Sequence, residues 1–313
     1  MSPYLLLTLT ALFWSGNFVL ARAVHAEIPP LALSFWRWLL ALLILLPLAG
    51  PRLWRQWPIA RAAWRPLLLL AAFGVAAFNS FVYLGLQHTT ATNAVLLQSA
   101  IPVLIIALSW LFLGQRLAAL QFLGLLVSLL GVGVIVFHGD LQRLQLLGFN
   151  RGDLLVMAAV ISWAVYSVLL RYRPAELSAL AFLLAIVALG VLLISPFYLW
   201  ELAAGKGFAL TLPNLLSVGY VGIFPSVLAY IFWNYGVDRV GASKAGLFIH
   251  LMPVFGILLS VVFLGERIRF FHFVGIVLIF LGIYWVQRAR AKVPGLGDER
   301  SQATFRPENV NRD

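Results

Sequence analysis

The sequence predicts an all-α membrane protein with ten transmembrane helices, arranged as two inverted five-helix repeats. Three observations support this prediction: the composition, the spacing of the apolar blocks and an internal repeat. Of the 313 residues, 62% are hydrophobic and only 11% are charged, whereas soluble domains carry about a quarter charged residues. Most of the chain therefore requires a lipid bilayer as its solvent. The chain contains no cysteine, which excludes disulfides and thiolate chemistry.

Ten apolar blocks are long enough to cross a bilayer, which takes about 20 residues of helix. Backbone groups in hydrocarbon must bond within their own segment, and the blocks show no alternation of period two, so helices are predicted rather than a barrel. The polar residues 87–90 divide a long uncharged stretch into a hairpin of two helices. The predicted spans are 3–21, 31–50, 67–87, 91–113, 120–138, 154–171, 178–198, 214–235, 242–264 and 270–287.

The lysines and arginines between the spans predict the orientation, because positively charged loops stay in the cytoplasm. An even number of spans places both termini on one side, and that side carries twice as many basic residues as the other. We therefore expect both termini in the cytoplasm. The net charge of +11 lies in such loops, so nucleic acid is not expected as a partner.

The two ends of the chain carry separate expectations. The first apolar block has neither a basic leader nor an evident cleavage site, so we interpret it as a retained helix. The segment 294–313 is polar, with alternating charges and with proline and glycine. Such a composition predicts a disordered tail, which the orientation places in the cytoplasm.

An internal repeat decides the predicted architecture. At an offset of 151, residues 85–136 align without a gap with residues 236–287, and 17 of the 52 positions are identical. Shared apolar composition alone gives roughly a third of that number and does not align proline and glycine, so the repeat indicates duplication. An offset of 149 extends it upstream, and the predicted repeats are 3–138 and 153–288. Each holds five helices, an odd number, so the second copy enters the membrane from the opposite side.

The two copies resemble a known family. The residues that carry the resemblance are Pro102, Leu113, Gly114, Gln115, Arg116, Phe122, Gly124 and Gly131, and in the second copy Pro253, Leu264, Gly265, Glu266, Arg267, Phe273, Gly275 and Gly282. They resemble the EamA repeat of the drug/metabolite transporter superfamily over about residues 3–290, with Gln115 where that family usually has glutamate. Within the superfamily the chain is most similar to the bacterial YddG-type aromatic amino-acid exporters. The resemblance implies an exporter of amino acids and related small metabolites in the bacterial inner membrane.

Aromatic and polar side chains gather at the predicted centre of the bilayer. Trp14 and Trp163 lie some ten residues inside their spans, whereas tryptophan normally concentrates at the membrane interfaces. They either pack between helices or wall a cavity in which a planar ligand stacks. Polar groups at helical spacing on the same or neighbouring spans either bond between helices or face that cavity. These candidates are Asn17, Asn79, Tyr83, Tyr166, Tyr230 and Asn234.

Two mid-span prolines predict a second feature of the centre. Pro102 and Pro253 each remove one helical hydrogen bond, which frees the carbonyl group four residues earlier. A freed carbonyl can bind an ammonium group, and Gln98, Ser99 and His250 stand beside the breaks. The alternative is a simple kink whose free groups bond to neighbouring hydroxyls or water.

Arg37 is the one clearly intramembrane charge, about two turns inside its span. It either extends toward the membrane surface or attracts the carboxylate of a substrate. No carboxylate lies in the middle of a span, which argues against a buried carboxylate proton relay. Facilitated diffusion and a proton step at His250 both stay open.

The predicted function is secondary transport by alternating access, with amino acids as substrates, a single chain as the working unit, and neither cofactor nor metal. The alternative within the superfamily is the export of other small metabolites or drugs. An intramembrane enzyme is the alternative from another class, but the sequence shows no metal-ligand motif such as H-E-x-x-H and no nucleophile paired with a base. A nucleotide-sugar carrier would need several buried cations, and Arg37 alone is available.

Overall fold

The structure is a computed structural model that describes residues 1–89, 91–115, 118–137, 150–264 and 269–288. Within these ranges ten helical segments are long and apolar enough to span a membrane, and each overlaps one of the ten predicted blocks. The prediction of an all-α membrane protein with ten spans is therefore confirmed. The predicted tail, 294–313, lies outside the described residues.

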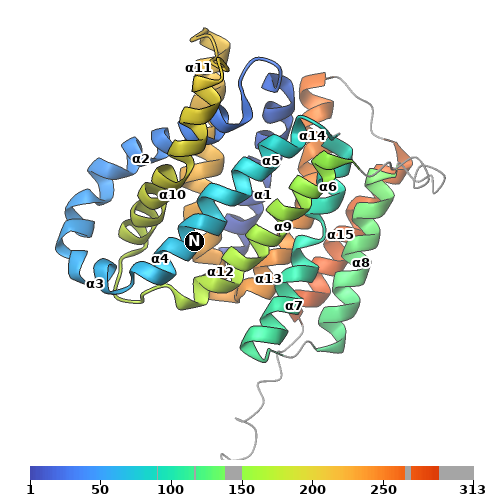
Figure 1. Cartoon of the computed structure of the whole chain (residues 1–313). Coiled ribbons are helices and arrows are strands. Elements are labelled where there is room, and N and C mark those ends of the chain that lie inside the picture. Colours follow the sequence, from blue (N-terminus) through green and yellow to red (C-terminus); the bar gives the residue numbers. More distant parts are fainter. Residues whose placement is uncertain (90, 116–117, 138–149, 265–268, 289–313) are drawn as a thin grey trace, which may run out of the picture.

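The elements follow one another with short connections (Figure 1). The first half contains α1 Pro3–Val24, α2 Pro30–Arg55, α3 Trp57–Ala62, α4 Trp64–Leu70, the π-helix η1 Ala71–Ala77, α5 Phe78–Leu86, α6 Ala91–Gln98, α7 Ile101–Leu113 and α8 Ala119–Val136. The second half contains α9 Arg151–Leu169, the 3-10 helix η3 Leu170–Tyr172, α10 Ala179–Ala203, α11 Leu212–Gly222, the π-helix η4 Ile223–Leu228, α12 Ala229–Val240, α13 Ala242–Gly246, the 3-10 helix η5 Leu247–His250, α14 Leu251–Leu264 and α15 Phe270–Arg288.

Successive spans run in opposite directions across the bundle (Figure 1). We call the end at which α1 begins the near side, and the end at which α1 finishes the far side. Helix α2 continues five residues past its predicted end, through Pro51, to a last turn that contains Arg52 and Arg55. Basic residues in a last turn favour helix, since they face the negative end of the helix dipole.

Helices α8 and α15 show the two-fold relation between the repeats directly. They pack side by side at one edge of the bundle (Figure 1). A Cβ on Gly124 would lie 2.7 Å from the carbonyl oxygen of Gly282, and a Cβ on Gly131 would lie 2.7 Å from that of Gly275. At the offset of 151, Gly275 corresponds to Gly124 and Gly282 to Gly131, so the contacts are reciprocal. Reciprocal contacts between equivalent positions require a two-fold axis between these helices.

Equivalent residues also meet in the interior. Ser99 contacts His250 and Asn79 contacts Tyr230, in both cases at an offset of 151 residues. Trp14 and Trp163, which correspond at an offset of 149, have ring centroids 4.8 Å apart. A residue can touch its own equivalent only near the axis that relates them. The axis of the inverted repeat therefore passes through the centre of the bundle.

Four spans are interrupted near mid-membrane. The fourth span breaks after Gln98 and resumes at Ile101, with Pro102 in the first turn of α7, and the ninth passes through η5 before α14. The third and eighth spans contain η1 and η4, which occupy equivalent positions. π-Helical turns inside α-helices are frequent at functional sites.

Candidate functional site

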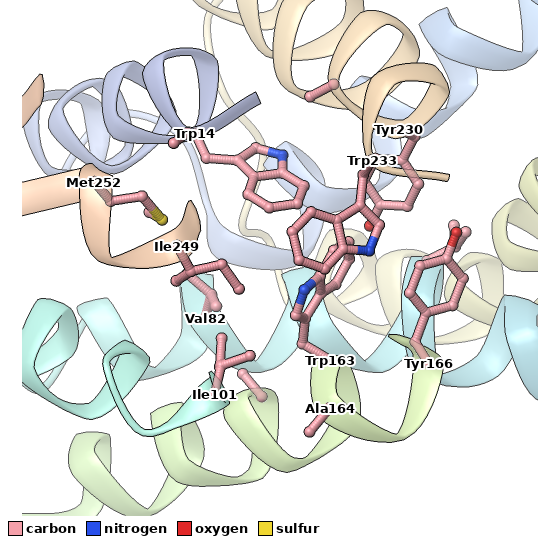
Figure 2. Packing of buried hydrophobic residues seen from close by; sticks show 14 of the residues in the cluster. Trp14, Val82, Ile101, Trp163, Ala164, Tyr166, Tyr230, Trp233, Ile249 and Met252 are labelled. Carbon is pink, nitrogen blue, oxygen red and sulfur yellow. The ribbon is translucent and has the colours of Figure 1, made fainter. Parts of the chain in front are cut away.

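Five aromatic rings form a cluster where α1, α9 and α12 meet. Trp14, Trp163 and Trp233 converge from these three helices (Figure 2), and their exposed fractions lie between 1 and 7%. The edge of Trp14 meets the face of Trp163, and Tyr230 lies 5.4 Å from Trp163 between ring centroids. Tyr166 completes the cluster at 5.0 Å from Trp163. Edge-to-face pairs of this kind add about 0.5–1.5 kcal/mol each beyond burial.

A small cavity, which we call the central cavity, lies against one face of this cluster. Its volume is about 10 Å³, which is the space of about one water molecule. The site is therefore occluded in this conformation. The cavity is lined by Trp14, Asn17, Phe18, Arg37, Phe78, Asn79, Gln98, Ile101, Trp163, Ile249 and Met252.

The guanidinium of Arg37 is the centre of a polar network beside this cavity. The side chain is 1% exposed. Its Nη1 donates to Oδ1 of Asn79 at 2.8 Å, to Oδ1 of Asn17 at 3.3 Å and to the hydroxyl of Tyr83, while its Nε donates to Oγ of Ser226 at 2.8 Å. Arg37 thus points into the bundle and does not extend toward the membrane surface.

Two Tyr–Asn hydrogen bonds flank the centre. The hydroxyl of Tyr83 donates to Oδ1 of Asn17 at 2.8 Å, and the hydroxyl of Tyr166 donates to Oδ1 of Asn234 at 2.7 Å. The positions are equivalent in the two repeats, since Asn17 corresponds to Tyr166 and Tyr83 to Asn234. The residue types are exchanged while the bond is kept. The first pair lies in the far half of the bundle and the second in the near half, and we call them the far pair and the near pair.

The π-helices supply free carbonyl groups to the aromatic cluster. The indole Nε1 of Trp14 donates to the carbonyl oxygen of Pro225 in η4 at 3.2 Å. The equivalent carbonyl in η1, that of Gly74, accepts from the hydroxyl of Tyr230. Trp163, the equivalent of Trp14, consequently has a buried indole N–H without a partner.

Ser99 and His250 lie on the axis but not on the wall of the central cavity. The Nε2 atom of His250 lies 3.0 Å from the carbonyl oxygen of Ser99, and its Nδ1 lies 2.7 Å from Oγ of Ser128. With both ring nitrogens bonded to neutral groups, the ring is fixed between the two interrupted spans. The carbonyl of Ser99, at the break of the fourth span, thus bonds within the protein.

A larger cavity opens from the near side toward the cluster, and we call it the near-side vestibule. Its volume is about 330 Å³. Asn234 of the near pair lines it, and the ion pair between Arg173 and Asp238, at 3.5 Å, lies on its wall. The remaining wall consists of Leu113, Gln115, Ser167, Val168, Leu170, Arg171, Ala175, Val237, Gly241 and Ala242. The vestibule and the central cavity share no lining residue, and Asn234 lines the first while Trp14 and Trp163 line the second.

The sequence-based candidates divide into three groups. Those on the wall of the central cavity are Trp14, Asn17, Arg37, Asn79, Gln98 and Trp163. Those that bond or pack around it are Tyr83, Tyr166, Tyr230 and Asn234. Those at the helix breaks are Ser99, His250, Pro102 and Pro253.

Sequence reasoning missed several residues at the centre. Trp233 belongs to the aromatic cluster, and Phe18, Phe78, Ile101 and Met252 line the cavity. The sequence could have identified Trp233, because it follows Tyr230 by three residues and so lies on the same face of the helix. The apolar residues carried no signal, since apolar side chains fill every span.

An inverted-repeat bundle of ten spans, interrupted near mid-membrane around a polar site on its axis, defines the class of multi-pass membrane transporters. The particular family follows from a family model that matches residues 1–137 and 150–288: the chain belongs to the EamA-like transporter family.

Relatives of this chain carry transporter names. It is 31% identical over 295 residues to an uncharacterized transporter of Archaeoglobus fulgidus, covering 90% of this chain and 96% of the relative. It is 30% identical over 268 residues to a probable terminal-alkyne amino-acid exporter of Streptantibioticus cattleyicolor, covering 83% and 84%. A probable amino-acid metabolite efflux pump of Escherichia coli is 24% identical over 292 residues, covering 88% and 91%. One solved crystal structure has the same fold, with a TM-score of 0.72 at 23% identity, covering 91% of this chain and 96% of that chain.

Proposed function

We propose that this protein exports amino acids, aromatic and other neutral ones, together with related small metabolites, by alternating access. Two of the relatives are named as a probable amino-acid exporter and a probable amino-acid metabolite efflux pump, which supports the substrate class. Similarity to the YddG-type aromatic amino-acid exporters belongs to the same proposal. The transporter moves its substrate chemically unchanged, so it is not an enzyme.

The membrane and the orientation are part of the proposal. The protein lies in the inner membrane of a bacterial cell with its near side, and hence both termini, in the cytoplasm, because the near-side loops carry most of the basic residues. The near-side vestibule then admits substrate from the cytoplasm. The vestibule and the central cavity are both built by one chain, so a monomer suffices for transport.

The observation that carries the proposal is the position of the central cavity. It lies beside the axis of the inverted repeat, where Trp14 meets Trp163 and Asn79 meets Tyr230. A site at this place keeps its surroundings when the two repeats exchange conformations, and it opens alternately to either side. Rings and uncharged polar groups dominate its wall, which suits a zwitterion with an apolar side chain.

The test is transport by purified protein in liposomes. Vesicles loaded with each of the twenty amino acids should release the aromatic and large neutral ones faster than vesicles without protein, both with and without a pH gradient. The variant Trp163→Ala should slow release, whereas Trp110→Ala should not, because Trp110 is 61% exposed on the outer surface of α7. Release of no amino acid above the protein-free background would refute the proposed function.

A further inference from the structure

Three hydrogen-bond donors on the wall of the central cavity lack a partner. The amide Nε2 of Gln98 and the indole Nε1 of Trp163 are buried without a hydrogen bond. The third donor is Nη2 of Arg37, because the hydrogen bonds of this guanidinium to the described residues use only Nε and Nη1. All three residues line the same cavity. Leaving a buried donor unpaired destabilises a protein, so the two buried donors of Gln98 and Trp163, together with the free Nη2 of Arg37, indicate a missing acceptor.

The positive charge of Arg37 lacks a counter-ion as well. Its four partners are amide and hydroxyl oxygens. Among the described residues two carboxylates are buried, and both are engaged elsewhere. Glu201 accepts from the backbone N–H of Ala32 at 2.7 Å, and Asp153 accepts from Thr89 and from the backbone N–H of Asn150. A buried cation is stable when an anion accompanies it, and the described residues supply none here.

Comparison of the two repeats shows that the donors gather on one side of the axis. Trp14 bonds to the carbonyl of Pro225, but its equivalent Trp163 is left unpaired, because Tyr230 occupies the equivalent carbonyl of Gly74. Arg37 corresponds, at the offset of 149, to the apolar Ile186. Two unpaired donors therefore share one chamber with the charge of Arg37, while the unpaired indole N–H groups of Trp38 and Trp233 lie outside it.

The interrupted fourth span adds a positive helix terminus at the same place. Helix α7 has 13 residues and begins at Ile101, on the cavity wall, and no side chain caps its first turn. The N-terminus of a helix carries roughly half a positive charge and attracts anions. Broken helices in transporters use such termini for anionic groups of their substrates. Together with Gln98, which is 3% exposed, the terminus gives this wall of the cavity an anion preference.

We propose that Arg37, Gln98 and Trp163 form the subsite for the carboxylate of the transported molecule. The inference rests on the proposed function and names its substrate class: a small molecule with one free carboxylate joined to an apolar or aromatic side chain. A carboxylate offers two acceptor oxygens with about four lone pairs, enough for all three donors. Trp163 also belongs to the aromatic cluster, so its ring and that of Trp14, which line the same cavity, receive the side chain.

Occupation of the subsite changes the protein around it. The central cavity holds about one water molecule, so a substrate enters only when the ring of Trp14 or Trp163 moves aside. A carboxylate bound to Nη2 also draws the guanidinium toward the substrate and away from Asn17 and Tyr83, which share Nη1 of Arg37. Substrate binding therefore weakens the far pair, on the side through which the substrate leaves.

The experiment measures binding of matched ligands to the purified protein by thermal stabilisation and by displacement of radiolabelled L-phenylalanine. L-phenylalanine and 3-phenylpropanoate carry the carboxylate, whereas L-phenylalaninamide and 3-phenylpropanamide replace it by a neutral amide. We expect each amide to bind about 10- to 100-fold more weakly than its acid. In Arg37→Gln the acids should fall to the affinity of the amides while the amides are unchanged.

A second variant, Trp163→Phe, keeps the proposal testable if Arg37→Gln does not fold. Trp163→Phe removes the unpaired N–H together with part of the ring and should reduce the preference for acid over amide, whereas Trp14→Phe, which loses the same part of the ring but whose N–H bonds to Pro225, should keep it. Equal binding of acids and amides by the native protein, or binding of neither, overturns the subsite. Equal losses for acids and amides in Arg37→Gln overturn it too. If no amino acid crosses the liposome membrane, the proposed function fails, but 3-phenylpropanoate against its amide still decides the subsite.

Discussion

The far pair and the near pair occupy equivalent positions but differ in their surroundings. In both, a tyrosine hydroxyl donates to an asparagine oxygen at 2.7–2.8 Å. Around the far pair, Arg37 bonds to both members and ties them to Asn79 and Ser226. Around the near pair the residue equivalent to Arg37 is the apolar Ile186, and Asn234 borders an open vestibule.

The difference teaches how an inverted repeat acquires a preferred state. If the two halves were identical, the inward-open and outward-open conformations would have equal free energies, since the two-fold axis exchanges them. Only differences between the halves separate those energies. The charge of Arg37 strengthens the far pair, and a hydrogen bond to a charged group is about twice as strong as a neutral one. The comparison therefore predicts a resting state that is closed at the far side.

The largest expected effect comes from making the two halves alike. In Arg37→Ile the far pair loses the cation, and we expect far-side opening to increase roughly 100-fold, since two hydrogen bonds to a charged group are lost. The chain has no cysteine, so single cysteines report accessibility cleanly. Val237→Cys reports the vestibule, and Leu86→Cys reports the equivalent far-side position. Labelling rates at the two sites measure the shift.

The control for this prediction is Arg37→Lys, which keeps the positive charge but lacks the planar guanidinium group. Its ratio of labelling at the two cysteine positions should lie between those of the native protein and Arg37→Ile. Monodisperse elution of each variant checks the fold. An unchanged ratio of labelling at Leu86→Cys and Val237→Cys in well-folded Arg37→Ile would show that Arg37 does not hold the far side closed.

The second prediction concerns a region where the halves are alike. Gly124 and Gly275 are equivalent, and a Cβ on them would lie 2.7 and 2.8 Å from the carbonyl oxygens of Gly282 and Gly131. Backbone atoms cannot move aside, so Gly124→Ala and Gly275→Ala should each destabilise the protein by about 1–3 kcal/mol, and equally. Gly133→Ala, whose Cβ would have no atom nearer than 3.9 Å, is the matched control. Thermal unfolding in detergent measures all three, and unequal effects of the two equivalent glycines would contradict the symmetry.

Most of the fold could be predicted from the sequence because each transmembrane span can be recognised by itself, without knowledge of the other spans. Each span needs only length and apolarity, and the repeat offset fixed the inversion without any knowledge of contacts. The difference between the two repeats at the site was harder to predict from the sequence. Arg37 was visible as an intramembrane charge, but its partners Asn17 and Ser226 lie on other spans, and no single-sequence pattern states which side chains meet across a bundle.

The π-helices explain why part of the site could not be predicted. Attention to proline singled out Pro102 and Pro253, whereas Pro225 and its equivalent Gly74 mark the segments whose carbonyls bond Trp14 and Tyr230. No residue pattern in the sequence predicts a π-turn, and the close approach of the Tyr166 ring to Gly74 is visible only in the folded structure. The repeat could have drawn attention to the two positions, because a proline and a glycine correspond there.

A third prediction separates the two tyrosines. Tyr83→Phe removes a hydroxyl that bonds to both Asn17 and Arg37, whereas Tyr166→Phe removes one that bonds to Asn234. The first should cost about 1.5–3 kcal/mol and the second about 0.5–1.5 kcal/mol. Their effects on accessibility should be opposite, with Tyr83→Phe exposing the far side and Tyr166→Phe the near side. The labelling assay with Leu86→Cys and Val237→Cys reads both, and a shift in the same direction for both would break the comparison.

The smallest effect is expected for the two central tryptophans. Trp14→Phe loses the hydrogen bond to the carbonyl of Pro225 and should lower the melting temperature in detergent by a few degrees, the equivalent of about 1 kcal/mol. Trp163→Phe loses the same part of the ring but an N–H that has no partner among the described residues, so its melting temperature should fall less than that of Trp14→Phe. This order of melting temperatures is expected because the carbonyl of Gly74, which corresponds to that of Pro225, accepts from the hydroxyl of Tyr230 and not from the indole of Trp163. A larger loss for Trp163→Phe than for Trp14→Phe would mean that the indole of Trp163 is already satisfied in the resting protein, and that the two halves differ less at their centre than these hydrogen bonds indicate.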